Sequence, residues 1–219
     1  HQESNPFRLI SDFAGCFKTL WQDKLGQISL AVTTLFWGAG ATLQFIVLKW
    51  AEYSLNLPLY KAAVLQGVFA IGISLGAIAA ARFVSLKRSL SVMPLGIAMG
   101  IMVMTMIFVR DVALAYPLLI AIGGLAGYFV VPMNALLQHR GHVLMSAGHS
   151  IAVQNFNENL SVLTMLGIYA LMVSLNLNVL VVIVLFGLFV ASTTYMVMRR
   201  HAANQREFDS LALIGEHKH

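Results

Sequence analysis

The sequence predicts an all-α integral membrane protein, a bundle of six transmembrane helices. Hydrophobic residues make up 58% of the 219 residues and charged residues only 11%, and the mean hydropathy is +0.78. An ordinary soluble domain carries about 25% charged residues, so lipid must solvate much of this chain. The apolar runs are continuous rather than alternating, which favours helices over an outer-membrane barrel.

Six apolar stretches are long enough to cross a bilayer, which takes about 20 helical residues. These predicted spans are Ile28–Trp50, Ala62–Val84, Leu90–Val109, Val112–Leu137, His149–Val173 and Asn178–Met198. An even number of spans places both ends of the chain on the same side of the membrane.

The positions of the basic residues give the orientation. Only Lys49, Lys61 and Arg110 lie on one side, whereas the other side carries eleven of the fourteen Lys and Arg residues. Those eleven are Arg8, Lys18, Lys24, Arg82, Lys87, Arg88, Arg140, Arg199, Arg200, Arg206 and Lys218. The positive-inside rule assigns this side to the cytoplasm. The net charge of +5 therefore indicates topology and contact with anionic lipid, and no nucleic-acid partner is expected.

We divide the chain into three parts. Residues 1–25 form a cytoplasmic linker, residues 26–200 the transmembrane bundle, and residues 201–219 a polar cytoplasmic tail. Within the linker, apolar side chains recur at helical spacing over Phe7–Trp21. This pattern predicts an amphipathic helix that lies on the membrane face or packs on the bundle. Because the chain begins with His1 rather than Met, we expect it to be a piece of a longer protein.

Pairs of glycines recur four residues apart inside the spans. They are Gly72 with Gly76, Gly96 with Gly100, and Gly123 with Gly127. Such pairs let helix backbones approach closely in lipid, which predicts packing positions within the bundle. Pro117 and Pro132 lie inside the fourth span, where bent helices are tolerated if neighbours satisfy the backbone.

The fifth span carries most of the intramembrane polar residues. Gln154, Asn155, Glu158 and Asn159 fall within an arc of about 140°, and Asn157 lies outside it. Glu158 lies about 14 Å along the predicted helix, near the bilayer centre. A charge there costs on the order of 3 kcal/mol, so it needs a cavity or a partner. We interpret this face as a substrate or proton site, or alternatively as a structural hydrogen-bond cluster between helices.

Two further amides complete the candidate substrate-binding set of Glu158, Gln154, Asn155, Gln44 and Asn134. Gln44 lies inside the first span and is a candidate cavity residue. Asn134 and Gln138 lie near the cytoplasmic end of the fourth span, where each lines a cavity mouth or caps the helix end, the cap being slightly favoured.

Signals for an enzyme are weak. His139, His142 and His149 form a predicted solvated loop with no Cys or carboxylate beside them to complete a metal site. The phosphate-binding motif G-x-x-x-x-G-K-[ST] does not occur, and the letters of the nucleophile motif G-x-S-x-G occur only at Gly72–Gly76, inside the second apolar span rather than at a strand-to-helix turn. We therefore expect no catalytic residues, no metal and no cofactor, and we interpret the single Cys16 as an unreactive thiol.

The chain resembles the C-terminal half of the bacterial lysophospholipid transporters, a branch of the major facilitator superfamily. The strings that carry the resemblance are Thr34–Leu43, Phe129–Gln138 with Arg140–Gly141, Ile151–Asn155 with Glu158–Asn159, and Leu166–Tyr169. The chain departs from the family at Gln44, where the family form carries an arginine.

The resemblance implies a twelve-helix transporter whose first six helices precede this chain, with Phe7–Trp21 in the linker between the halves. It also implies import, or flipping, of lysophospholipids such as lysophosphatidylethanolamine across the bacterial inner membrane, and a functional link to a cytoplasmic acyltransferase. Glu158 would then pair with the headgroup ammonium, and Gln154, Asn155 and Gln44 with phosphate oxygens. The alternatives are a major facilitator with another small substrate, a non-transporting membrane subunit and, more remotely, a membrane acyltransferase.

Overall fold

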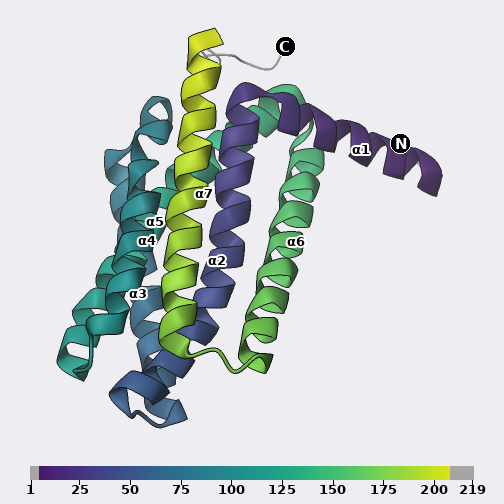
Figure 1. Cartoon of the computed structure of the whole chain (residues 1–219). Coiled ribbons are helices and arrows are strands. Elements are labelled where there is room, and N and C mark those ends of the chain that lie inside the picture. Colours follow the sequence, from purple (N-terminus) through teal and green to yellow (C-terminus); the bar gives the residue numbers. More distant parts are fainter. Residues whose placement is uncertain (1–4, 208–219) are drawn as a thin grey trace.

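The computed structural model describes residues 5–207, which fold into helices joined by short connections (Figure 1). In chain order the elements are α1 (Pro6–Gln22), α2 (Lys24–Leu55), α3 (Leu59–Phe83), η1 (Leu86–Val92), α4 (Pro94–Met104), η2 (Thr105–Phe108), α5 (Val112–Leu144), α6 (Ala147–Ser174) and α7 (Val179–Glu207). The η elements are short 3₁₀ helices that flank α4 and complete its span.

The prediction of six membrane-spanning segments is confirmed within residues 5–207, because six segments are long and apolar enough to cross a bilayer. Most of the predicted spans are shorter than the helical segments in the structure. The first span begins at Lys24 rather than Ile28, and the fourth continues to Leu144 rather than Leu137. The last continues to Glu207, into the predicted tail, while residues 208–219 lie outside the described residues. Helices extend beyond the hydrocarbon into polar surroundings, where hydropathy no longer marks them.

Side-chain caps explain several of the helix starts. The Asp23 carboxylate accepts a hydrogen bond from the backbone N–H of Gly26 at the start of α2, and Asp111 caps α5 in the same way through Ala113. Such caps satisfy N–H groups that lack a partner within the helix. Pro117 and Pro132 both lie inside α5, which continues through them.

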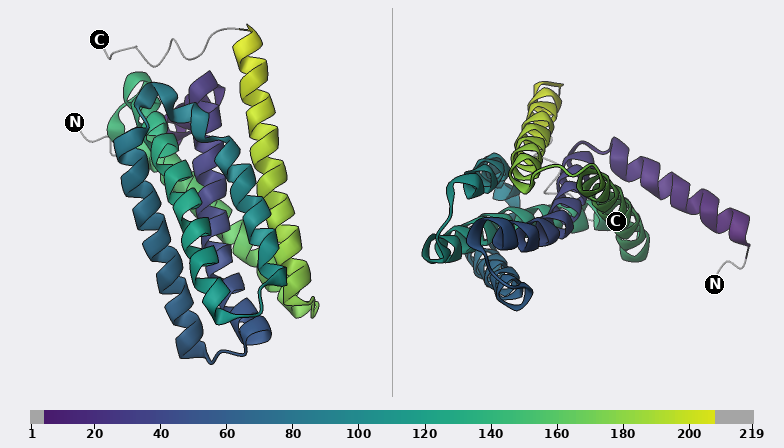
Figure 2. Two further views of the ribbon diagram at one scale, coloured as in Figure 1. Left: turned by 90° about the vertical axis from the view of Figure 1, so that its left-hand side faces the viewer. Right: turned by 60° about the horizontal axis from the view of Figure 1, so that its bottom comes forward.

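α2 lies at the centre of the bundle and contacts α3, α5, α6 and α7. Trp50 of α2 is fully buried, and its indole N–H donates to the carbonyl oxygen of Met106 in η2 at 3.0 Å. Around α2, α3 packs along α5 and α4 packs along α7 (Figure 2). α6 packs mainly on α2, and only Ser150, Val153 and Asn157 of this helix are buried.

α1 leaves the bundle at the end where α2 begins (Figure 1). In its second half Leu20 is buried, and the rings of Phe13 and Phe17 lie 5.5 and 6.1 Å from that of Phe156 in α6. The first half extends away from the bundle, with Phe7 82% exposed (Figure 2). The predicted helix is therefore confirmed, and its second half packs on the bundle.

Cys16 lies in this second half of α1 and is half-buried. Burial, together with the negative charge of Asp12, raises the pKa of its thiol. Since the thiolate is the reactive form, the thiol stays protonated near neutral pH, as expected of an unreactive cysteine.

The predicted glycine pairs lie where two helices touch. A Cβ on Gly72 would come within 2.6 Å of the carbonyl oxygen of Ile120, and one on Gly76 would overlap the carbonyl oxygen of Gly124. On the facing side, Gly123 and Gly127 approach the α3 backbone as closely. Gly96 and Gly100 play the same part between α4 and α7. The predicted packing role is confirmed.

A buried ion pair joins the start of α2 to the end of α5. The Arg140 guanidinium donates from Nε to Asp23 Oδ2 at 2.9 Å and from Nη2 to Oδ1 at 2.7 Å. The two side chains are 2% and 10% exposed. The prediction that Arg140, His139 and His142 belong to a loop is therefore wrong, since α5 continues past them. Arg140 lies on the buried face of that extra length of helix.

Replacing Gly76 by valine should separate α3 from α5, because the new side chain would overlap the backbone of Gly124. Overpacking of this kind costs about 1–3 kcal/mol. We expect a clear fall in the melting temperature of the detergent-solubilised protein, followed by size-exclusion chromatography after heating. Gly67→Val is the matched control, because it lies on the same helix with nothing within 4 Å of its Cβ. Equal losses in the two variants would contradict the packing role.

Arg140→Gln should destabilise the fold by about 3–5 kcal/mol, because it leaves the Asp23 carboxylate buried without its counter-ion. Adding Asp23→Asn should recover part of the loss, since the amide oxygen still caps α2. Arg200→Gln is the control at the same end of the bundle, because it removes only an exposed hydrogen bond to Gln27. Thermal unfolding of the four proteins measures the effect, and an unchanged melting temperature for Arg140→Gln would refute it.

Candidate functional site

Three of the predicted site residues form one hydrogen-bonded cluster between α5 and α6. The Gln154 side-chain amide donates to Asn134 Oδ1 at 3.0 Å and to Glu158 Oε1 at 2.8 Å. All three side chains are half-buried. Gln154 therefore links the glutamate of α6 to the neighbouring helix.

The local sequence places this cluster deep within α6. Ser146 caps the helix by accepting from the backbone N–H of His149. Glu158 then lies eleven residues after Ala147, the first residue of α6, or about 16 Å along the helix axis. Residues four apart lie on the same face, which brings Gln154 and Glu158 together.

Asn134 is not a helix cap. α5 continues ten residues beyond it to Leu144, so its backbone needs no cap at that point. Its side chain instead accepts the hydrogen bond from Gln154. The slightly favoured prediction that Asn134 caps the helix is thus wrong. It followed from placing the end of the span at Leu137, seven residues before α5 ends. Gln138 also lies inside α5, and its side chain is exposed.

Asn155 lies on the exposed side of α6, apart from the Asn134–Gln154–Glu158 cluster. Its carbonyl oxygen accepts from the side chain of Asn159 at 2.8 Å, within the same helix. Asn157 is buried and donates to the carbonyl oxygen of Val153, also within α6. This agrees with the helical angles, which place Asn157 off the polar face. Asn155 and Asn159 are exposed, and within residues 5–207 their side chains form no hydrogen bond to another helix.

Gln44 is half-buried in α2. Its backbone carbonyl accepts a hydrogen bond from the side-chain amide of Gln66 in α3 at 2.7 Å. Within residues 5–207, no hydrogen bond joins the Gln44 side chain to the Asn134–Gln154–Glu158 cluster. Gln66 was missed in the sequence, although a single amide in an otherwise apolar span was a usable signal.

The chemistry of this face suits a polar ligand that carries both charges. A carboxylate attracts a cation, and side-chain amides both donate and accept hydrogen bonds. In the described part of the chain, no group of three or more His, Cys, Asp or Glu residues is placed to hold a metal ion. The side chains present therefore suit direct hydrogen bonding and ion pairing.

Comparison with known proteins gives close relatives. The chain is 47% identical over 178 residues to proteins named Lysophospholipid transporter LplT from Yersinia pestis (strains Pestoides F and Angola) and Yersinia pseudotuberculosis serotype O:3 (strain YPIII). The match covers 81% of this chain and 44% of each relative. No protein-family model and no solved structure matches the chain significantly.

The chain therefore spans less than half the length of the curated relatives it matches. These relatives are named as transporters, which agrees with the expectation that the chain is not an enzyme. The resemblance is confirmed: this multi-pass membrane chain is a relative of the lysophospholipid transporters, and its coverage is consistent with the C-terminal half of a major facilitator protein.

Proposed function

We propose that the chain is the C-terminal half of a lysophospholipid transporter and works together with a preceding half of similar size. Rocking transport needs two bundles around a shared site, and six helices supply one wall. The names of the relatives and the 44% coverage support this proposal. In it, lysophospholipids such as lysophosphatidylethanolamine move inward across the bacterial inner membrane, where an acyltransferase at the cytoplasmic face restores the second chain.

The same proposal gives the parts of the chain their roles. Residues 1–25 are the linker between the halves, residues 26–200 the bundle, and residues 201–219 the cytoplasmic tail. α1 and the C-terminal end of α7 lie at the same end of the bundle (Figure 1), which supports a shared cytoplasmic location. The exposed apolar side chains in the first half of α1, Phe7 and Ile10 among them, suit contact with lipid there.

The observation that carries the site is the half-buried Glu158 bonded to Gln154 on a helix with few buried residues. In our proposal Glu158 pairs with the headgroup ammonium, while Gln154, Asn155, Gln44 and Asn134 donate to phosphate oxygens or orient the donors. The preceding half covers the exposed side of α6 and closes the site. The acyl chain stays in apolar surroundings throughout.

Glu158→Gln should lower uptake of lysophosphatidylethanolamine about tenfold in cells that carry the complete gene. A charged hydrogen bond is worth about 1.5–3 kcal/mol, and 1.4 kcal/mol corresponds to about a factor of ten. Uptake of radiolabelled lipid, normalised to the amount of protein in the membrane, is the measurement. Asp12→Asn makes the matching carboxylate-to-amide change at an exposed position of α1 and should leave uptake unchanged.

A purely structural role for Glu158 gives a different result. The variant would then melt at a lower temperature and be equally impaired toward lysolipids with and without an ammonium group. Normal uptake by a well-expressed Glu158→Gln protein would remove this residue from the proposed site.

A further inference from the structure

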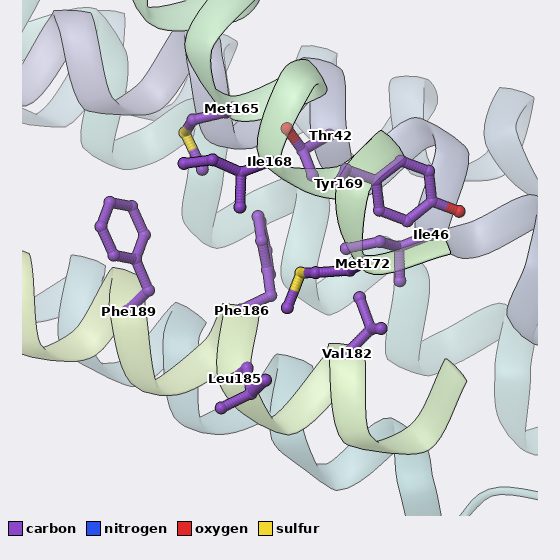
Figure 3. A pocket seen from close by; sticks show the side chains of 10 residues that line it. All are labelled: Thr42, Ile46, Met165, Ile168, Tyr169, Met172, Val182, Leu185, Phe186 and Phe189. Atoms are coloured by element: carbon purple, nitrogen blue, oxygen red, sulfur yellow. The ribbon is translucent and has the colours of Figure 1, made fainter. Parts of the chain in front are cut away.

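An apolar groove lies between α6 and α7, with α2 as its floor. Figure 3 shows its lining, which includes Met165 and Met172 from α6, Phe186 and Phe189 from α7, and Ile46 from α2. The cavity has a volume of about 150 Å³. Every lining residue belongs to a segment long and apolar enough to span the membrane. The groove therefore offers hydrocarbon-like contacts at membrane depth.

A second, polar hollow lies between α2, the α6–α7 connection and the start of α7, at the end of the bundle opposite α1. It has a volume of about 610 Å³. Its lining residues are Lys49, Glu52, Tyr53 and Asn56 from α2 and its end, Asn176, Leu177 and Asn178 from the α6–α7 connection, and Val179 from α7. The side chain of Asn178 donates to the Tyr53 hydroxyl at 3.2 Å, which ties this connection to α2.

The two hollows follow one another along α2 and α7 and past the end of α6. On α2 the lining passes from Ile46 in the groove to Lys49 in the polar hollow, within one helical turn. On α7 it passes from Val182 to Val179 in the same distance. Past the end of α6, Asn176 of the α6–α7 connection follows Met172 by four residues. The two hollows are thus neighbours, and together we call them the cleft, with a polar mouth and an apolar interior.

The mouth carries one positive and one negative side chain, Lys49 and Glu52, and both can bind a ligand. Among residues 5–207, neither Lys49 nor Glu52 has a hydrogen-bond or ion-pair partner for its side chain. Both are exposed. They lie three residues apart on α2, a spacing that puts them on neighbouring parts of one helix face. An ammonium of the protein thus stands beside a carboxylate, the complement of a ligand that carries a phosphate and an ammonium.

We propose that this cleft binds a single-chain zwitterionic phospholipid, with the phosphate at Lys49, the ammonium at Glu52 and the acyl chain between α6 and α7. This proposal rests on the proposed function and adds a substrate-loading site at the end of the bundle that we assign to the outer leaflet. The orientation is that of a lipid in its own leaflet, with the headgroup at the interface and the chain along the membrane normal.

The size of the groove favours one acyl chain over two. An apolar cavity of roughly 150 Å³ holds a ligand of the size of benzene, so the groove encloses a stretch of one chain. A diacyl lipid would place its headgroup in the same mouth but would have to leave its second acyl chain outside the groove. The small volume of the groove therefore favours a lysolipid over the diacyl lipids of the surrounding bilayer.

The cleft is separate from the Asn134–Gln154–Glu158 cluster. The nearest groove residue on α6, Met165, follows Glu158 by seven residues, or about 10 Å along the helix, and the polar mouth lies past the end of α6. A lysolipid bound in the cleft would thus hold its headgroup beyond the C-terminal end of α6, whereas the cluster lies near the middle of that helix. In this proposal, the headgroup of a lysolipid that crosses the membrane occupies the mouth of the cleft first and the Asn134–Gln154–Glu158 cluster later.

The test uses the complete protein in nanodiscs of diacyl phosphatidylcholine. The probe is lysophosphatidylethanolamine with a photoreactive diazirine near the end of its acyl chain, and mass spectrometry locates the label. We expect label on the groove residues Met165 and Phe189. Met172→Trp, which places an indole inside the groove where Figure 3 shows the Met172 side chain, should lower this labelling at least about fivefold. Leu188→Trp places the same side chain on an exposed position of α7 outside the lining and should leave labelling unchanged.

The headgroup contacts are tested by competition. Lys49→Gln and Glu52→Gln should each weaken competition by unlabelled lysophosphatidylethanolamine about two- to fivefold, as expected for exposed ion pairs. With lysophosphatidylglycerol, which has no ammonium, only Lys49→Gln should have an effect. Equal competition by diacyl phosphatidylethanolamine, label spread over α3 and α6 outside the groove, or equal losses for the two tryptophan variants would overturn the proposal.

Binding and transport are separated by the readouts. Label in the groove of a protein that moves no lysolipid would support the cleft and contradict the proposed function. Uptake without label in the groove would support the function and contradict the cleft. Glu158→Gln should lower uptake while leaving groove labelling in place.

Discussion

Hydrocarbon offers no hydrogen-bond partner, and the structure of this chain depends on that constraint. Each backbone N–H and C=O inside the membrane must be satisfied by the chain itself, which leaves helices for its long apolar runs. The same constraint acts on side chains. Trp50 reaches a backbone carbonyl of η2, Gln66 reaches one of α2, and Gln154 joins two helices through Asn134 and Glu158.

With apolar surface favoured equally by lipid and by protein, close backbone contact and buried polar bonds hold the helices together. Glycines let α3 lie against α5 and α4 against α7. Asp23 and Arg140 then fix the start of α2 to the end of α5, with both side chains nearly withdrawn from solvent. α6 is different, because little of it is buried and it packs mainly on α2. Of the six membrane-spanning segments within residues 5–207, the least buried is also the one that carries the intramembrane carboxylate.

This arrangement gives α6 two polar regions of different character. Near its middle, the half-buried Glu158 and Gln154 form a polar cluster with Asn134 of α5. Beyond its far end, the α6–α7 connection joins α2 in a hollow lined by Lys49 and Glu52, with an apolar groove behind it. A transporter for single-chain lipids needs places of both kinds, because its ligand has a charged head and an apolar tail that move together.

Composition and the continuity of the apolar runs were enough to predict six membrane-spanning helices, since the cost of exposing backbone to lipid does not depend on tertiary contacts. The glycine spacing likewise predicted close packing, and the angles along α6 separated Asn157 from its polar neighbours. The partners were decided by the tertiary structure. Asp23 and Arg140 lie 117 residues apart, and Arg140 belongs to a helix only because α5 continues past the end of its apolar run. Asn134 and Gln154 likewise meet only because α5 and α6 pack together. The cleft between α2, α6 and α7 likewise depends on how three helices cross, which hydropathy along a chain does not encode.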